Sequence, residues 1–249
     1  MRLPVAKAEM VLKLMVEGMS IRSIERLTEV HRDTIMRLLV LAGERCEILL
    51  GETVQNIRAK DVEVDEVWTY IRKKENKKTP EEADDAGIGD AYTFVAIERN
   101  TKLVLAWHLG RRTRISTMHF MGKLRKALNP MHWFQLTSDG FRPYVEAVKY
   151  QLGRRVDFAQ LVKVYATARE GEQRYSPGDV IETIPTPIFG NPDPDRICTS
   201  HVERQNLTMR MQIRRLTRLT NAFSKKWENL RAALALHFAW YNFVRVHRT

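Results

Sequence analysis

The chain has 249 residues, of which 44% are hydrophobic, and 41 lysines and arginines against 30 acidic residues give a formal charge of +11. This length and composition fit one medium-sized domain plus a small one, with a substantial core. No apolar run approaches the roughly 18 residues of a membrane span, and the first ten residues contain no signal-peptide core. The excess charge indicates a polyanionic partner, of which duplex DNA is the commonest. The alternative is a generally basic, soluble enzyme.

Two cysteines, Cys46 and Cys198, form no CxxC pair and no cluster with histidine in the sequence. A zinc site is therefore not expected. The sequence does not decide whether the two form a disulfide, although two lone thiols are more typical of a reducing compartment.

The first 50 residues predict three helices. Residues 5–16 place apolar side chains at helical spacing, Gly18 ends that helix, and Ser20 can cap a second, short helix. A third helix is expected from residue 31 or 32 to Leu41. This order is typical of a helix-turn-helix, and a plain three-helix bundle used for oligomerisation is the alternative.

This small unit needs its own apolar core and an outward face. The expected core consists of Ile21, Ile24, Leu27, Val30, Ile35 and Leu38. Polar side chains at the start of the third helix would face outward, and they are His31, Arg32, Asp33, Thr34 and Arg37. These residue types contact phosphates and base edges, so the unit is interpreted as DNA-binding.

The rest of the chain reads as an α/β domain. We expect a helix-turn-helix domain at 1–50, a partly helical connector at 51–59 and a catalytic domain at 60–249. Within the last, strands are expected at 60–72, 92–98, 102–109, 132–137 and 156–165, and helices at 115–128, 142–152 and from residue 200 to the end. A charged loop is expected at 73–90, and an irregular insertion with five prolines at 166–198. An antiparallel hairpin start followed by βα units predicts a ribonuclease-H-like mixed sheet with flanking helices.

Three acids fit metal-assisted phosphoryl transfer, in which carboxylates from distant segments hold divalent ions. Asp65 lies inside the apolar strand VEVDEVW, Asp139 follows the strand WFQLTS, and Glu203 lies in the first turn of a helix. Taken singly, each has a simpler explanation: Asp139 could form an Asx-turn or helix cap, and Glu203 could favour its helix N-terminus. The three together, in this strand order, favour a metal site.

The helix that carries Glu203 adds further polar side chains near the proposed metal site. Glu203, Asn206 and Arg210 share one helix face, with His201 and Arg204 close by.

Two further sets of charges accompany the three acids. Arg210, Arg214 and Arg218 repeat at four-residue spacing and suit a DNA backbone, although a solvated basic face is the alternative. Glu63 and Glu66 are rival metal ligands, and strand alternation puts Glu63 on the Asp65 face and Glu66 on the other.

These segments resemble a known family. VDEVW around Asp65, TSDGFRPY around Asp139 and HVERQNLTMRMQIRRLTRLTNAFSKK around Glu203 are similar to the DDE transposases of the insertion-sequence-one group, as is the final YNFVRVHRT. ERQNLTMR is the most specific block, and the resemblance covers most of the chain.

The resemblance implies a ribonuclease-H-like catalytic fold with Asp65, Asp139 and Glu203 as catalytic residues and metal ligands for Mg²⁺ or Mn²⁺. It also implies hydrolysis that exposes a 3′-hydroxyl at the element end, and attack of that hydroxyl on target DNA. His201 and Asn206 would orient the third carboxylate or a phosphate.

The partners would be double-stranded DNA, as terminal inverted repeats and target. We expect a dimer or larger homo-oligomer in the bacterial cytoplasm, associated with the nucleoid and not with a membrane. Relatives continue past the tail motif, so a truncated or domesticated DNA-binding regulator is one alternative, and a related metal-dependent nuclease is the other.

Overall fold

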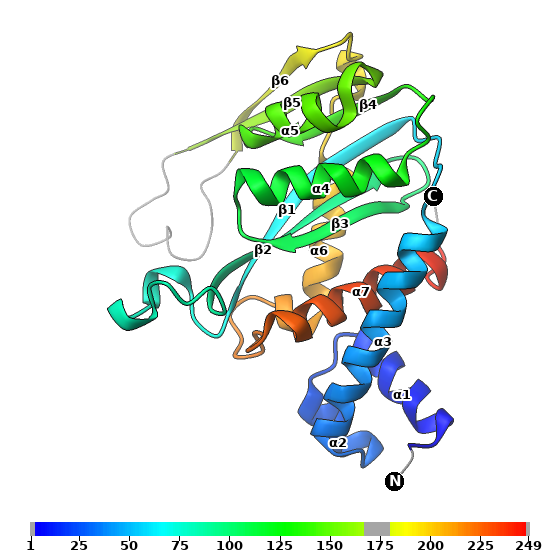
Figure 1. Ribbon diagram of the computed structural model, residues 1–249, viewed down its shortest axis with the longest axis vertical. Coiled ribbons are helices and arrows are strands. Elements are labelled where there is room, and N and C mark those ends of the chain that lie inside the picture. Colours follow the sequence, from blue (N-terminus) through cyan, green and yellow to red (C-terminus); the bar gives the residue numbers. More distant parts are fainter. Residues whose placement is uncertain (1–2, 167–179, 248–249) are drawn as a thin grey trace.

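The computed structural model describes residues 3–166 and 180–247. Figure 1 shows a central sheet with two helices, α4 and α5, across one face and α6 behind the other, while α1, α2 and much of α3 form a separate group of helices at one end. The last helix, α7, lies between this group and the sheet.

Among the described residues, six strands form one mixed sheet in the order β3-β2-β1-β4-β5-β6. They are β1 (Asp61–Ile71), β2 (Gly89–Glu98), β3 (Val104–Gly110), β4 (Phe134–Asp139), β5 (Val156–Tyr165) and β6 (Val180–Phe189). The first three strands are antiparallel neighbours, β4 runs parallel to β1 and β5, and β6 returns antiparallel to β5. This is the ribonuclease-H-like order, so the predicted fold class is confirmed.

Seven α-helices accompany the sheet in the described part of the chain. They are α1 (Val5–Val16), α2 (Ile21–Thr28), α3 (Arg32–Thr53), α4 (Arg114–Ala127), α5 (Pro143–Leu152), α6 (Ser200–Gln212) and α7 (Trp227–Phe243). Local sequence explains several starts: the Ser20 hydroxyl accepts a hydrogen bond from the Ser23 amide, and Thr113 does the same for α4. Pro143 occupies the first turn of α5, where no amide hydrogen is needed.

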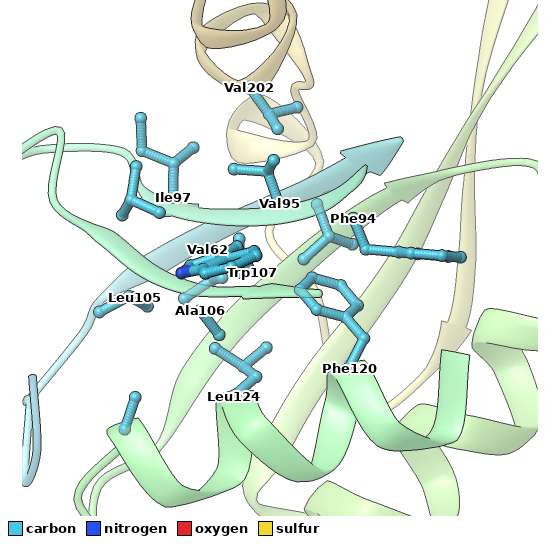
Figure 2. Packing of buried hydrophobic residues seen from close by; sticks show 14 of the residues in the cluster. Val62, Phe94, Val95, Ile97, Leu105, Ala106, Trp107, Phe120, Leu124 and Val202 are labelled. Carbon is cyan, nitrogen blue, oxygen red and sulfur yellow. The ribbon is translucent and has the colours of Figure 1, made fainter. Parts of the chain in front are cut away.

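The sheet core is built by alternation along β2. Figure 2 shows Val202 of α6 over Val95 and Ile97, whereas Phe120 of α4 meets Phe94 from the opposite face. The ring centroids of Phe94 and Phe120 lie 5.6 Å apart. Both faces of the sheet are therefore covered by apolar side chains, which fixes where α6 lies relative to β1.

The N-terminal helices have a core of their own. Val11, Ile24, Val30 and Ile35 are fully buried in it, and Ile21 and Leu38 pack against it. Leu27 was expected in this core but is 56% exposed, because the turn of α2 that carries it faces outward.

Two predicted boundaries are wrong. The third helix does not end at Leu41 but continues to Thr53, into residues expected in the connector. Its residues beyond Leu41 still pack on α7, because Gly43 approaches Ala232 and Cys46 packs against the cluster of Ala232 and Leu236. The division into 1–50, 51–59 and 60–249 stays a prediction. Residues 180–189 form strand β6 rather than irregular chain.

The C-terminal part is not one continuous helical stretch. Helix α6 ends at Gln212, and a linking segment, residues 213–226, precedes α7 with only a short 3-10 turn at Arg214–Leu216. The Arg72 amide donates to the Ser224 carbonyl at 2.9 Å, so this segment lies beside the end of β1. Among the described residues, no helix is both long and apolar enough to cross a membrane.

The crossing of α3 and α7 generates a stability prediction. A Cβ atom on Gly43 would lie 2.6 Å from the Ala232 Cβ, whereas a Cβ on Gly51, in the same helix, would meet nothing within 4 Å. Gly43→Ala should therefore lower the free energy of unfolding by about 1–3 kcal/mol. The control Gly51→Ala should raise it by up to about 1 kcal/mol. Urea denaturation measures both, and equal effects of the two substitutions would contradict this close helix contact.

Candidate active site

Asp65 and Asp139 are brought together by the parallel pairing of β1 and β4. The register of that pair runs from Asp61 opposite Gln135 to Val64 opposite Ser138. The next residue on each strand is the aspartate, so both carboxylates lie where the paired ladder ends. Beyond Val64 the pairing of β1 with β4 stops, and the cleft that holds both aspartates opens there.

Glu66 joins the two aspartates. Asp65, Glu66 and Asp139 each offer one carboxylate oxygen within 4.8 Å of the others. We call these three residues the acidic cluster. Glu66 lies on the opposite face of β1 from Asp65, as alternation predicts, yet its carboxylate still approaches both neighbours because β1 is open at this edge.

Several donors already hold the acidic cluster in place. The Asn206 side-chain amide donates to Asp65 Oδ2 at 2.8 Å, and the Phe141 amide donates to Asp139 Oδ1 at 3.0 Å. These bonds use only part of the hydrogen-bonding capacity of the oxygens. The remaining lone pairs are available to a ligand.

The electrostatics of the cluster are unfavourable for ionised carboxylates. Burial, followed by the charges of Glu66 and Asp139, raises the pKa of Asp65 to about 8. Burial and Asp139 raise the pKa of Glu66 to about 7, and burial also raises the pKa of Asp139. A bound cation would relieve this repulsion.

Two residues that the sequence did not single out stabilise the charged form of Glu66. Arg112 Nε donates to Glu66 Oε1 at 2.8 Å, and its Nη2 lies 3.6 Å from Asp139 Oδ2. Its guanidinium carbon also lies 3.9 Å from the centre of the Phe141 ring. The Tyr144 hydroxyl donates to Glu66 Oε2 at 3.2 Å. No sequence pattern marks Arg112, which lies in the link between β3 and α4, as a partner of Glu66.

Glu203 lines the same cleft, of about 730 Å³, as Asp65 and Asp139. It is not one of the three close acids, because its Oε1 accepts from Lys163 Nζ and from Thr199 Oγ1. The structure therefore brings the three predicted acids into one cleft, with Glu203 held back by a lysine from β5.

Glu63 fulfils a different role from the rival ligand considered above. Its Oε2 accepts from the backbone amides of His201 at 2.8 Å and Val202 at 3.0 Å, and its Oε1 lies 2.8 Å from His201 Nδ1. Glu63 thereby fastens the start of α6 to β1. His201 accordingly contacts Glu63 rather than Glu203.

Cys198 does lie beside a histidine in the structure, a proximity that was not expected from the sequence. Cys198, His201 and Glu63 offer donor atoms within 4.8 Å of one another, because Glu63 reaches them from a distant strand. Glu63 already accepts three hydrogen-bonding contacts there, so this group has a structural explanation. Both Cys46 and Cys198 are free thiols.

The basic residues after Glu203 do not form one helical stripe. Helix α6 ends at Gln212, so Arg214 lies in a 3-10 turn and Arg218 in the linking segment. Arg204, Arg214 and Arg218 are exposed. Arg210 is partly buried and donates to the carbonyls of Leu216 at 3.2 Å and Trp68 at 3.4 Å.

The predicted DNA-reading residues lie together at the start of α3. His31, Arg32, Asp33 and Arg37 are exposed and Thr34 is partly exposed. His31 Nδ1 also accepts from the Asp33 amide at 3.3 Å and so caps the helix.

The acidic cluster fits a hard divalent cation. Its donors are carboxylate oxygens, the ligands that Mg²⁺ and Mn²⁺ favour. Asn206, which holds Asp65, leaves its buried Oδ1 without a hydrogen-bond partner among the described residues. Both observations are consistent with a cation and its waters at this site.

Comparisons with known proteins locate structural neighbours only. No protein family and no curated protein matches the chain. The piggyBac transposase synaptic complex with hairpin DNA is 12% identical with a TM-score of 0.47, and the match covers 95% of this chain and 64% of that chain. The Mos1 transposase paired-end complex with the left transposon end is 14% identical with a TM-score of 0.26, and the match covers 63% of this chain and 58% of that chain. The chain thus spans less than two thirds of either neighbour.

The raised pKa of Asp65 predicts how stability changes with pH. Between about pH 4 and 8 the unfolded chain has lost the Asp65 proton that the metal-free native state retains, so the free energy of unfolding falls as pH rises. Asp65→Asn should reduce this fall, whereas Asp84→Asn, at an exposed site, should preserve it. Urea denaturation in EDTA at pH 5 and pH 8 measures the difference. The same pH dependence in all three proteins would contradict the stated electrostatics.

Proposed function

We propose that the chain is a metal-dependent DNA transposase of the DDE type, with Asp65, Asp139 and Glu203 as its catalytic carboxylates. It would cleave the ends of an insertion sequence and join them to target DNA. The observation that carries this proposal is the position of Asp65 and Asp139 at the end of the β1–β4 ladder, in one cleft with Glu203. The motif resemblance around each of the three acids supports it independently.

In this proposal Asp65 and Asp139 hold Mg²⁺ or Mn²⁺ together with Glu66 or Glu203. The bound ions would activate the attacking oxygen and stabilise the leaving oxygen of the phosphodiester. Asn206 keeps Asp65 oriented through its 2.8 Å hydrogen bond. Arg112 positions Glu66 and contributes positive charge beside Asp139, which lowers the cost of burying three acids.

Glu203 would enter the metal site when its pair with Lys163 gives way to the ion. Lys163 and Glu203 both line the cleft, so the ammonium group would then be close to an incoming phosphate. Arg112 holds Glu66 beside the two aspartates, where Glu66 would serve as a third ligand until Glu203 enters.

DNA binding would be shared between two surfaces. His31, Arg32, Thr34 and Arg37 at the exposed start of α3 suit a DNA groove. The exposed Arg204, Arg214 and Arg218 suit the phosphate backbone near the cleft. Strand transfer requires two DNA ends to be held together, so the active form would be a dimer or a larger assembly.

Asp139→Asn provides the test. We expect at least a hundredfold loss of Mg²⁺-dependent cleavage of a labelled duplex carrying the element end, because one metal ligand is removed, while binding of the same duplex in EDTA stays within threefold. Asp84→Asn, an exposed aspartate outside the cleft, should keep both properties.

The products distinguish transposition from its alternatives. Cleavage that leaves a 3′-hydroxyl, followed by joining to a second duplex, supports the transposase. Cleavage without joining would replace it with a nuclease, and binding without cleavage in wild-type protein would replace it with a regulator.

A further inference from the structure

Beside the acidic cluster lies a second cleft that the proposed chemistry does not use. It has a volume of about 410 Å³ and lies between the outer half of β1 and the linking segment 213–226. Its walls carry the aromatic side chains of Trp68, Tyr70 and Phe223. We call it the aromatic cleft.

The three rings form one row. The centroids of Trp68 and Tyr70 lie 5.8 Å apart, and those of Tyr70 and Phe223 lie 4.9 Å apart. Trp68 and Tyr70 share a face of β1 by alternation, and the linking segment adds Phe223 from the other side. All three are partly exposed, so the row offers aromatic surface to a ligand.

Cations surround the row. Lys74, Arg210, Arg215 and Arg218 line the aromatic cleft, and no acidic residue lines it among the described residues. Lys74 Nζ lies 5.5 Å from the Trp68 ring centre. None of the three guanidiniums is within ion-pair distance of a carboxylate in the described part of the chain. An anionic ligand with a flat apolar part would complement this lining.

We propose that the aromatic cleft receives an unpaired nucleotide of DNA, with its base stacked on the aromatic row and its phosphate among the cations. Stacking on aromatic side chains beside lysine and arginine is how proteins bind single-stranded nucleic acid without reading a sequence. The volume is within the range of about 300–1,000 Å³ usual for small-ligand sites. An acidic peptide would not use the rings, and a lipid chain would not suit a rim of cations.

The location gives this binding a purpose, and this step rests on the proposed function. Trp68 follows Glu66, a member of the acidic cluster, by two residues on the same face of β1, which is about 7 Å along the strand. The axial rise of DNA is about 3.4 Å per nucleotide, so the stacked base would lie within about three nucleotides of the scissile phosphate. Arg210 connects the two places, since it donates to the Trp68 carbonyl from the helix that carries Glu203.

The rim has one further feature consistent with opening a duplex. Leu219 lies at the edge of the aromatic cleft, is 86% exposed and adopts a left-handed backbone conformation with φ of 58°. Such a conformation is unfavourable for leucine, and exposed apolar side chains of this kind are inserted between bases by proteins that unstack DNA. Leu219 is thus placed to occupy the space that the displaced base leaves.

The test compares two duplexes of equal length in EDTA, one blunt and one with a three-nucleotide overhang carrying 2-aminopurine. Wild-type protein should bind the overhang duplex more tightly and quench the 2-aminopurine fluorescence. Trp68→Leu should weaken overhang binding roughly 5- to 150-fold, the range expected for one stacked base, and abolish the quenching. It should change blunt-duplex binding less than twofold.

Matched variants separate stacking from folding. Trp68→Phe should retain overhang binding within threefold, since it keeps an aromatic face. Trp133→Leu alters a 55% exposed tryptophan that precedes β4, at the opposite end of the parallel β1–β4 pair, and should have no effect. Lys74→Ala and Arg218→Ala should each reduce the slope of log affinity against log salt by about one for the overhang duplex. A circular dichroism spectrum of each variant identifies any that fails to fold.

Equal affinity of wild-type protein for both duplexes, or an equal loss on both in Trp68→Leu, would overturn the proposal. Because no step requires metal or cleavage, an inactive enzyme would leave this result unaffected. Absence of binding to either duplex would instead contradict the proposed function itself.

Discussion

The candidate active site depends on the mutual repulsion of three partly buried carboxylates where the parallel pairing of β1 and β4 ends. Asp65, Glu66 and Asp139 cannot all ionise there at little cost, and the raised pKa values of all three record that cost. Folded proteins retain such groups where a ligand repays the repulsion. The neighbouring Arg112 offsets only part of the charge, so the cluster is prepared for a cation.

The surrounding fold serves to hold that cluster. The two strands bring the aspartates side by side. Glu63 lies two residues before Asp65, on the same face of β1, and fixes the start of α6 by accepting hydrogen bonds from two backbone amides. Once α6 is fixed, Asn206 reaches Asp65 and Glu203 reaches the cleft. The same helix ends at Gln212, which allows the following segment to cross the open edge of β1 and form the aromatic cleft beside the acids.

Much of this frame could be predicted from the sequence. Alternating and apolar runs predicted the first five strands in their chain order, and an aspartate inside one strand with another at the end of a second fitted a metal site. The roles of Glu66 and Arg112 could not be predicted, because they depend on where β1 loses its partner strand. The end of α6 was missed because the basic residues after Gln212 keep helical spacing, whereas the burial of Ile213 and Leu216 bends the chain away.

Joint binding of a divalent cation by Asp65 and Asp139 is what the proposed chemistry requires first. A crystal structure with Mn²⁺, measured at a wavelength where manganese scatters anomalously, tests it directly. We expect an anomalous peak at about 2.0–2.2 Å from a carboxylate oxygen of each of the two aspartates, near the octahedral distances usual for such ions. A peak at Cys198 and His201 instead, or no peak at saturating Mn²⁺, would contradict it.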